Sequence, residues 1–430
     1  MLKCRWKALR RVWLLALIIA LSQPSQGYAV FTHQQLIDLA WDGAIRPLLI
    51  SRYPQTTEAE LRIAHAYAYG GCVIQDMGYY PFGHDFFSDL THYVRSGDFV
   101  LSLLRNSRNV NEYAFAIGAL SHYVGDSVGH REAVNPSTAI EFPKLEKKYG
   151  SVVTYQDSPS AHVRTEFGFD IDQLSARRFA PQRYLDSIGF KVAGRLLRVA
   201  FQETYGLELT EVLGPEFPAV HSYRSSVRKF IPLFAYAEEV IHKHHFKQDT
   251  LNQDFAIYEK RLNQIDYKHY ARAYRNPGLG AHIIAVFIVI LPRIGKLSYL
   301  AIKDPTAETE ALYVASVNRS VDLFRLHLEK LQRDGVEQPD LPNRDLDTGD
   351  LVRPGAYRRT DRAYAKLLQR ITARPEREVR AGIKRDIFAY YANPNAPIET
   401  KKHKKEWLRV QQELGQLKEM PVATSASHVD

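Results

Sequence analysis

The stretch EYAFAIGALSHYVGDSVGH, residues 112–130, decides the fold class. Its apolar residues recur at intervals of three and four, which is the period of one face of an α-helix. Three polar residues follow the same helix at four-residue spacing, namely His122, Asp126 and His130. Because residues four apart lie one turn above each other, these side chains could converge on one point.

The chemistry of this triplet indicates a metal site. Imidazole nitrogens and carboxylate oxygens are the usual non-thiolate ligands of zinc, whereas an acid in a salt bridge more often faces Lys or Arg. The same residues are also compatible with a polar stripe that is solvated or satisfied within the core. This segment by itself leaves that alternative open.

The rest of the chain favours an all-α fold. With 430 residues, 45% hydrophobic and 24% charged, the sequence is typical of a globular protein of two or three domains. Helical periodicity recurs in residues 58–76, 223–245 and 311–334, and strand-like alternation is scarce. The run HIIAVFIVILP, residues 282–292, is too short to span a bilayer and is interpreted as a buried core helix.

The first 27 residues have the pattern of a secretory signal peptide. Five basic residues precede an apolar run over residues 12–21, and small residues follow it. A cut before Tyr28 or before Val30 satisfies the small-residue rule, and an uncleaved anchor is the alternative to cleavage. We therefore expect export to the periplasm or the medium, with one remaining thiol, Cys72, and no intramolecular disulfide.

The charge of the exported chain argues against nucleic acid as a partner. The formal net charge is +9, and removing the five basic residues of the N-terminal segment leaves about +4, too mild to indicate a phosphate-binding surface.

Further candidate ligands lie on both sides of the central triplet. Asp76 stands before a Gly and Pro break and is followed by His84 and His92, which compete for one role. His162 and Glu166 again have helical spacing, and His33 lies near the expected mature N-terminus. A lone His is more often a satisfied core or surface residue. Together these residues form an ordered set: His33, Asp76, His92, His122, Asp126, His130, His162 and Glu166.

This ordered set resembles that of the bacterial zinc-dependent phospholipases C, whose fold is shared with single-strand-specific zinc nucleases. The resemblance covers roughly residues 28–170 and includes an early His, an isolated Asp, a His, H-x-x-x-D with a further His, and H-x-x-x-E. Two features depart from the family: the interval from Asp126 to His130 is shorter, and Tyr28 stands where Trp is typical.

The resemblance implies two to three zinc ions. Asp126 would bridge a pair, with Asp76, His92 and His122 on one ion, and His33 with the Tyr28 amine and carbonyl on the other. His130, His162 and Glu166 would hold the third ion. Asp76 would also orient or deprotonate the attacking water, and so be the catalytic residue. The Tyr28 amine requires cleavage before that residue, because a peptide nitrogen cannot bind zinc in this way.

The implied function is exported phosphodiester hydrolysis, with a phospholipid or membrane surface as the substrate. A single-strand-type nuclease is one alternative, and a non-catalytic, zinc-stabilised envelope or binding protein is another. The third trio has only three side chains, which favours a catalytic site with an open position. The aromatic segment 77–87 is compatible both with a lipid-facing rim and with the core. No protein partner can be inferred.

The expected organisation has four parts. A signal peptide covers residues 1–27, a multi-helix zinc-dependent phospholipase C-like domain 28–225, a helical accessory domain 226–391 and a polar, mobile tail 392–430. Asp345, Asp347 and Asp350 in the Pro- and Gly-rich segment 331–355 are interpreted as a turn, because the Gly and Glu of a calcium loop are missing.

Overall fold

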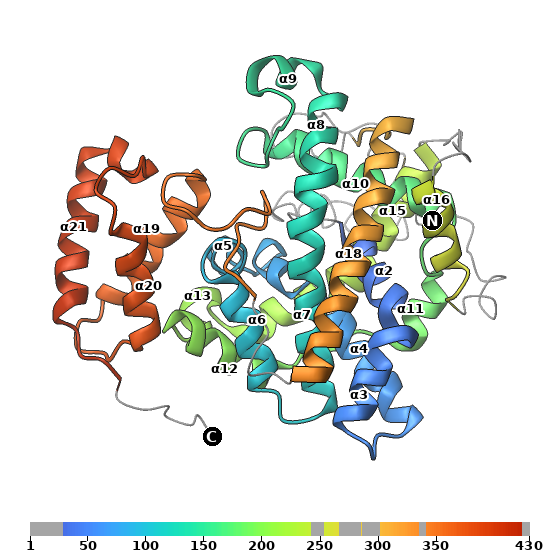
Figure 1. Cartoon of the computed structure of the whole chain (residues 1–430), viewed down its shortest axis with the longest axis horizontal. Coiled ribbons are helices and arrows are strands. Elements are labelled where there is room, and N and C mark those ends of the chain that lie inside the picture. The colour runs from blue at the N-terminus through green and yellow to red at the C-terminus, as the bar shows by residue number, and fades with distance from the viewer. Residues whose placement is uncertain (1–28, 242–252, 266–284, 286–301, 335–340, 424–430) are drawn as a thin grey trace, which may run out of the picture.

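The protein is a multi-helix assembly (Figure 1), seen in a computed structural model that describes residues 29–241, 253–265, 285, 302–334 and 341–423. Within these ranges the chain forms helices and connecting loops, and the only extended pairings are two isolated bridges, Arg344 with Leu351 and Val379 with Val422. The prediction of an all-α fold is confirmed.

Helix α7, Val110–Gly129, lies at the centre of the fold. Its N-terminus is capped by Asn109, whose side chain accepts hydrogen bonds from the amides of Asn111 and Glu112, both at 3.1 Å. The helix is buried over most of its length, with α4 (Glu58–Gly71), α6 (Ser96–Arg105), α2 (Val30–Ala40) and α18 (Ala307–Asp334) packed around it. Figure 1 shows the long α18 running beside α7.

Two glycines allow α4 and α7 to meet backbone to backbone. A Cβ on Gly71 would lie 2.0 Å from the carbonyl oxygen of Phe115, and one on Gly118 would lie 2.2 Å from that of Ala68. Any larger residue at either position would push the two helices apart. This close contact places the C-terminal end of α4 beside the turn of α7 that carries His122.

A carboxylate from α10 (Pro159–Ser175) fixes the start of α2. Asp170 Oδ2 accepts from the amide of Phe31 at 2.8 Å, and its Oδ1 accepts from the amide and hydroxyl of Thr32 at 3.2 and 2.6 Å. Unpaired amides at a helix N-terminus need such acceptors. The bond ties together the two helices that carry His33 and Glu166.

α7 continues without a break into the π-helical turn η3 (His130–Val134) and then α8 (Asn135–Glu141). Before α7, the 3₁₀ turn η2 (Ile74–Tyr79) leads into α5 (Asp85–Tyr93). The other helices of the first 241 residues are α3 (Arg46–Arg52), α9 (Pro143–Tyr149), α11 (Gln182–Ile188), α12 (Gly194–Tyr205), α13 (Leu209–Leu213), α14 (Glu216–Ser225) and α15 (Ile231–Ile241), with π-helical turns at Trp41–Ile45 and Ser226–Phe230. α16 (Gln253–Leu262) follows them and packs on α18.

The C-terminal part of the chain shares the core of the N-terminal helices. Phe324, Leu328 and Leu331 of α18 belong to the same buried cluster as the apolar residues of α7. After residues 341–357, which form turns, α19 (Arg358–Thr372) packs against α5, and α20 (Ala381–Tyr391) follows it. Figure 1 shows α19, α20 and α21 gathered at one end of the molecule.

The expected polar tail from residue 392 requires a correction. Residues Glu399–Lys402 form a 3₁₀ turn and Lys404–Glu419 form helix α21, which packs on α19. Val410 and Leu417 are fully buried on one face of this otherwise polar helix. Two buried residues seven apart are enough to dock an amphipathic helix, although the segment as a whole is polar in composition.

Several expectations lie outside the described residues. These are the signal peptide over residues 1–27, the role of Tyr28, and the expected core helix at 282–292, of which only Ala285 is described. None of the described helices combines the length and apolar character that crossing a bilayer requires.

Candidate metal centre

Three groups of buried side chains have the composition and spacing of metal sites. In each group one ligand atom per residue lies within 4.8 Å of the others. The groups are His33, His122 and Asp126; Asp76, His92 and His122; and His130, His162 and Glu166. The first two share His122, so together they form one larger cluster around α7.

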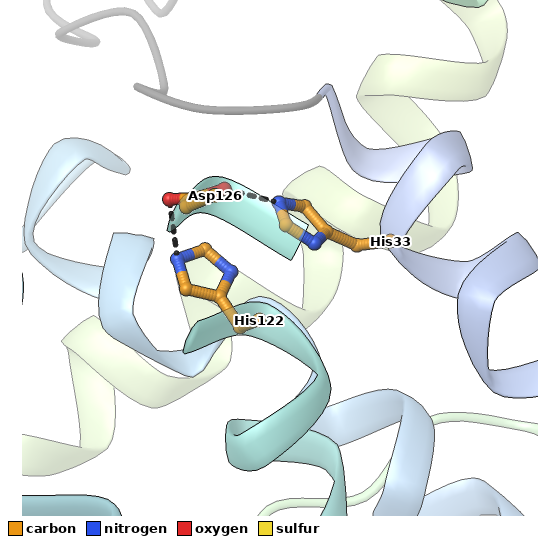
Figure 2. A group of neighbouring side chains, drawn as sticks. All are labelled: His33, His122 and Asp126. Atoms are coloured by element: carbon orange, nitrogen blue, oxygen red, sulfur yellow. Dashed lines mark ion pairs between the residues drawn. The ribbon is translucent and has the colours of Figure 1, made fainter. Parts of the chain in front are cut away.

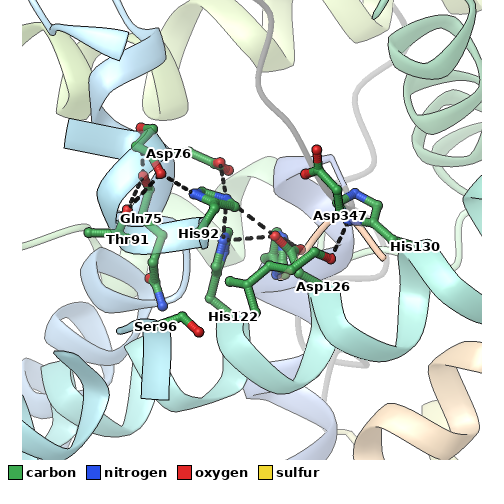
Figure 3. A network of polar contacts seen from close by, with 12 residues as sticks. Gln75, Asp76, Thr91, His92, Ser96, His122, Asp126, His130 and Asp347 are labelled. Atoms are coloured by element: carbon green, nitrogen blue, oxygen red, sulfur yellow. Dashed lines mark hydrogen bonds and ion pairs between the residues drawn. The ribbon is translucent and has the colours of Figure 1, made fainter. Parts of the chain in front are cut away.

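Asp126 lies at the centre of the larger cluster, with its two oxygens facing different histidines. Oδ1 is 3.1 Å from His33 Nε2, and Oδ2 is 3.0 Å from His122 Nε2 (Figure 2). His92 Nε2 lies 3.4 Å from Asp126 Oδ2 and 3.3 Å from Asp76 Oδ1. Figure 3 shows these side chains converging from η2, α5 and α7. A carboxylate placed in this way can bridge two cations.

Hydrogen bonds to backbone carbonyls fix the orientation of two of these rings. His122 Nδ1 lies 3.1 Å from the Cys72 carbonyl oxygen, and His92 Nδ1 lies 2.8 Å from that of Ser88. A carbonyl oxygen only accepts, so each Nδ1 carries the hydrogen and each neutral ring has a lone pair at Nε2. These two Nε2 atoms are 3.4 Å apart. Two facing lone pairs beside carboxylate oxygens repel each other unless a cation or a proton lies between them.

The third group, His130, His162 and Glu166, is called the third cluster, and its rings are also oriented by hydrogen bonds. His130 Nδ1 donates to the Leu346 carbonyl at 2.7 Å, which leaves Nε2 facing Glu166 Oε1 at 3.4 Å. His162 has the opposite tautomer: Nε2 donates to Asn135 Oδ1 at 2.9 Å, and Nδ1 faces Glu166 Oε1 at 2.8 Å. Outer-shell bonds of this kind orient imidazole ligands in metalloproteins. The donor set of both clusters, nitrogen and carboxylate oxygen, fits zinc.

The segment around Asp76 is held by its own hydrogen bonds. Gln75 Nε2 donates to the Ala119 carbonyl of α7 at 2.9 Å, and the Gln75 carbonyl accepts from Ser88 Oγ and Thr91 Oγ1 at 2.6 and 3.1 Å. The turn η2 is therefore tied to both α7 and α5. This arrangement holds the Asp76 carboxylate against His92.

Comparison with known families bears on this arrangement. Residues 32–213 match the family described as zinc dependent phospholipase C. This match covers less than half of the chain, and the matched part is called the phospholipase C region below. No curated protein and no solved structure shows a significant match to the chain. The resemblance to the zinc-dependent phospholipases C is therefore confirmed, and the family description supports a zinc-dependent hydrolase.

The phospholipase C region contains every described member of the predicted set. His33 comes from α2, Asp76 from η2, His92 from α5, and His162 and Glu166 from α10. Each of these side chains is at most 2% exposed, as are those of His122, Asp126 and His130. His130 reaches the third cluster at the start of the π-helical turn η3, so the short interval after Asp126 does not exclude it from that cluster.

His84 takes a different place from His92. It is the N-cap of α5, where its Nδ1 accepts a hydrogen bond from the amide of Phe86 at 3.1 Å. The choice between the two histidines, which the sequence left open, therefore favours His92 as the residue that joins the cluster.

The electrostatics of the larger cluster favour cations. Burial raises the pKa of Asp126, but the neighbouring His122, His33 and His92 outweigh it and hold that pKa well below its usual range. Burial lowers the pKa of His92, but contacts with Asp126 and Asp76 raise it to about 10. Without a metal, a proton thus occupies the position between these groups. A zinc ion can replace that proton.

At His162 and His33 the effect of burial on the pKa prevails over that of the neighbouring carboxylates. Burial lowers the pKa of His162 to about 4 and also lowers that of His33. Both rings are neutral near pH 7, which is the form that binds a metal.

Two residues that adjoin the third cluster were not predicted from the sequence. Asn135 orients His162 as described, and its Nδ2 donates to the Asp347 carbonyl at 2.8 Å. Asp347 belongs to the segment that was interpreted only as a turn. That turn is present, since the amide of Gly349, at φ 70°, donates to the Asp345 carbonyl at 2.8 Å. Its position beside the site depends on tertiary contacts that have no local sequence signal.

The aromatic segment 77–87 is mostly core. Met77, Phe86 and Phe87 are fully buried, and Tyr79 and Tyr80 are nearly so. Phe82 is the exception, because its side chain is 74% exposed and its backbone has φ 63°. A non-glycine residue in this region of backbone space is strained. The loop between η2 and α5 thus holds one aromatic ring in solvent near Asp76 in sequence.

Proposed function

We propose that the protein is an exported zinc-dependent phospholipase C with three zinc ions. The observation that carries this proposal is the arrangement of imidazole lone pairs against buried carboxylates, with 3.1 Å from Asp126 to His33 and 3.0 Å from Asp126 to His122. Burial of such groups without a cation is costly. The match to the phospholipase C family supports zinc as that cation.

In this proposal Asp126 bridges a zinc pair. His122, His92 and Asp76 complete one site, and His33 belongs to the other, together with the amine and carbonyl of Tyr28 at the mature N-terminus. The third ion lies among His130, His162 and Glu166. Each described residue in these sets faces its neighbours through a nitrogen or oxygen suited to zinc.

The reaction is hydrolysis of the phosphodiester at the bond between phosphorus and the diacylglycerol oxygen. Zinc lowers the pKa of water and stabilises charge that develops on phosphate oxygens. Asp76 orients the attacking water and accepts its proton, which then passes to solvent. A bond forms from the water oxygen to phosphorus, the bond to the glycerol oxygen breaks, and that oxygen takes up a proton from solvent, which balances the one released through Asp76. The products are diacylglycerol and the phosphorylated head group.

Two features support a lipid substrate. The matched family is described as zinc dependent phospholipase C, and Phe82 places an exposed aromatic ring on the loop that follows η2. Exposed apolar residues near a site suit contact with a lipid surface. The modest charge of the chain without its N-terminal basic segment gives no support to the nuclease alternative.

A second candidate function also rests on an observation. All eight described candidate ligands are at most 2% exposed, and sites closed to solvent are typical of structural zinc. A non-catalytic, zinc-stabilised protein of the cell envelope would show this burial without turnover. A turnover assay with purified protein distinguishes the two functions.

The test is turnover by purified protein with three substrates: phosphatidylcholine vesicles, a soluble phosphodiester and single-stranded DNA. The proposal expects phosphocholine release from the vesicles, loss of this activity with a chelator, and recovery with added zinc. His92→Asn and His84→Asn form a matched pair on α5, because Asn at position 84 keeps the helix cap. The first should abolish turnover and the second should preserve it. Zinc binding without turnover of any substrate would favour the envelope function.

A further inference from the structure

The C-terminal segment 341–357 forms part of the wall of the third cluster. The Leu346 carbonyl accepts from His130 Nδ1 at 2.7 Å, and the Leu346 amide donates to the His92 carbonyl at 3.1 Å. The Asp347 carbonyl accepts from Asn135 Nδ2 at 2.8 Å. The backbone at residues 346 and 347 is therefore fixed against α5, η3 and α8 at the same time.

The segment can approach this closely only because of a glycine. Gly349 has φ 70°, and a Cβ there would lie 2.1 Å from the Ser127 carbonyl oxygen of α7. At the start of the segment, Tyr123 OH donates to the Pro342 carbonyl at 2.6 Å. Pro342 and Gly349 thus both contact α7 through their backbone. Asp347 lies between these two residues in the chain, so its position is tightly defined.

The side chain of Asp347 is fully buried, and its two oxygens have different surroundings. Oδ2 accepts from Tyr93 OH at 2.9 Å and from Tyr357 OH at 2.5 Å. Oδ1 is buried and has no hydrogen-bond partner within the part of the chain that the structure describes. Figure 3 shows Asp347 beside His130. A buried carboxylate oxygen without a partner is costly, and a cation removes that cost.

The charge of Asp347 also acts on the third cluster. The negative charge of Asp347 acts on the rings of both His130 and His162. The three residues His130, His162 and Glu166 supply two neutral rings and one negative charge. A second carboxylate would balance a divalent ion and complete four protein ligands, the number found in structural zinc sites.

We propose that Asp347 is the fourth protein ligand of the third metal ion, which it binds through Oδ1. The inference rests on the proposed zinc function. With Asp347 as a ligand, the third site would have four protein ligands and no open position, whereas three side chains alone would leave one open. The hydrolytic reaction would then take place at the zinc pair bridged by Asp126. The third zinc then joins the C-terminal part of the chain to the phospholipase C region.

The experiment compares zinc content and cobalt spectra of the wild type, Asp347→Asn and Asp350→Asn. Asp350 is a matched control because it lies in the same turn, changes the charge equally and has a side chain that is 68% exposed. The wild type and Asp350→Asn should bind three zinc ions. Asp347→Asn should bind the third with an affinity lower by at least about 100-fold, since loss of an outer-shell partner alone costs about 10- to 100-fold.

A thiolate substitution keeps the test decisive if Asp347→Asn folds poorly. Asp347→Cys retains a zinc ligand of similar size, and its cobalt form should show the near-ultraviolet charge-transfer absorption of a cobalt–thiolate bond, which the wild type lacks. An unchanged third-site affinity in Asp347→Asn, or no thiolate band in Asp347→Cys, would overturn the inference. A wild-type protein that binds no zinc would instead refute the proposed function itself.

Discussion

Asp126 Oδ1 lies 3.1 Å from His33 Nε2, in a contact that joins the first described helix of the chain to its central one. Gly125 makes room for it, since a Cβ at that position would lie 3.4 Å from the His33 ring and 2.9 Å from Leu36. The other oxygen of Asp126 faces His122 and His92. One carboxylate therefore links two sets of ligands, which is the geometry that a bridged metal pair requires.

Replacing Asp126 should remove both zinc ions of the pair. Asp126→Asn keeps the shape of the side chain but loses the charge that both sets of ligands share. We expect zinc content to fall by two ions per chain and turnover to fall by at least about 100-fold. Metal analysis after gel filtration, together with phosphocholine release, measures both effects. Retention of the full zinc content would show that Asp126 is not a bridging ligand.

Asp76→Asn should separate turnover from metal binding. Asp76 Oδ1 lies 3.3 Å from His92 Nε2, and the proposed tasks of Asp76 include accepting a proton. We expect kcat to fall much more than zinc content, because His92, His122 and Asp126 remain in place. Steady-state kinetics and metal analysis on the same preparation test this. Equal loss of metal in the Asp76 and Asp126 variants would make Asp76 a purely structural ligand.

The metal-free protein should become less stable as the pH rises above neutrality. The pKa of His92 is about 10 in the folded, metal-free site, whereas an exposed histidine titrates near 6.5. Its contribution to stability is therefore fully present below about pH 6.5 and is lost as the pH approaches 10. Zinc replaces the proton, so the zinc-loaded protein lacks this contribution.

The measurement is urea unfolding of chelator-treated and zinc-loaded protein between pH 7 and pH 10. We expect the difference between the two unfolding midpoints to widen as the pH rises. A difference that stays constant over this range would mean that zinc does not displace a proton from His92.

The close contact between α4 and α7 makes a separate prediction about stability. Gly118→Ala would place a Cβ 2.2 Å from the Ala68 carbonyl, so we expect a loss of about 1–3 kcal/mol in the free energy of unfolding. Gly415→Ala in α21 is the control, because no atom lies within 4 Å of its added Cβ. A helix-interior glycine with free space should gain about 0.5–1 kcal/mol on this change. Chemical denaturation measures both, and equal stability of the two variants would contradict the packing argument.

The proposed export makes a prediction about the N-terminus of the mature protein. The small-residue rule permits a cut before Tyr28 or Val30, and the zinc proposal requires the first of these. We expect mass spectrometry of the exported protein to show Tyr28 as the first residue. A variant with one added residue there should lose zinc from the pair and most of its activity. Full activity in that variant would exclude the amine as a ligand.

Local patterns predicted the parts of the site that lie within single helices. Residues 112–130 have helical periodicity, and His122 and Asp126 lie one turn apart as their spacing implies. His162 and Glu166 likewise meet at 2.8 Å within α10. For these residues the geometry follows from the helix itself, and the family resemblance supplied their association with the remaining ligands.

The remaining parts depend on contacts between distant segments. The turn that carries Asp347 packs on α7 through Gly349, and no spacing in the sequence indicates that contact. Helix α21 was missed for a different reason. Its composition is polar, but Val410, Leu414 and Leu417 recur at intervals of four and three, so a search for periodicity in that segment would have found it.

Anomalous diffraction at the zinc absorption edge tests the central claim most directly. The account predicts three peaks per chain: two flanking the carboxylate of Asp126, each within about 2.0–2.2 Å of one of its oxygens, and one among His130, His162 and Glu166. A crystal of the zinc-supplemented protein with no peak beside Asp126 would contradict the account.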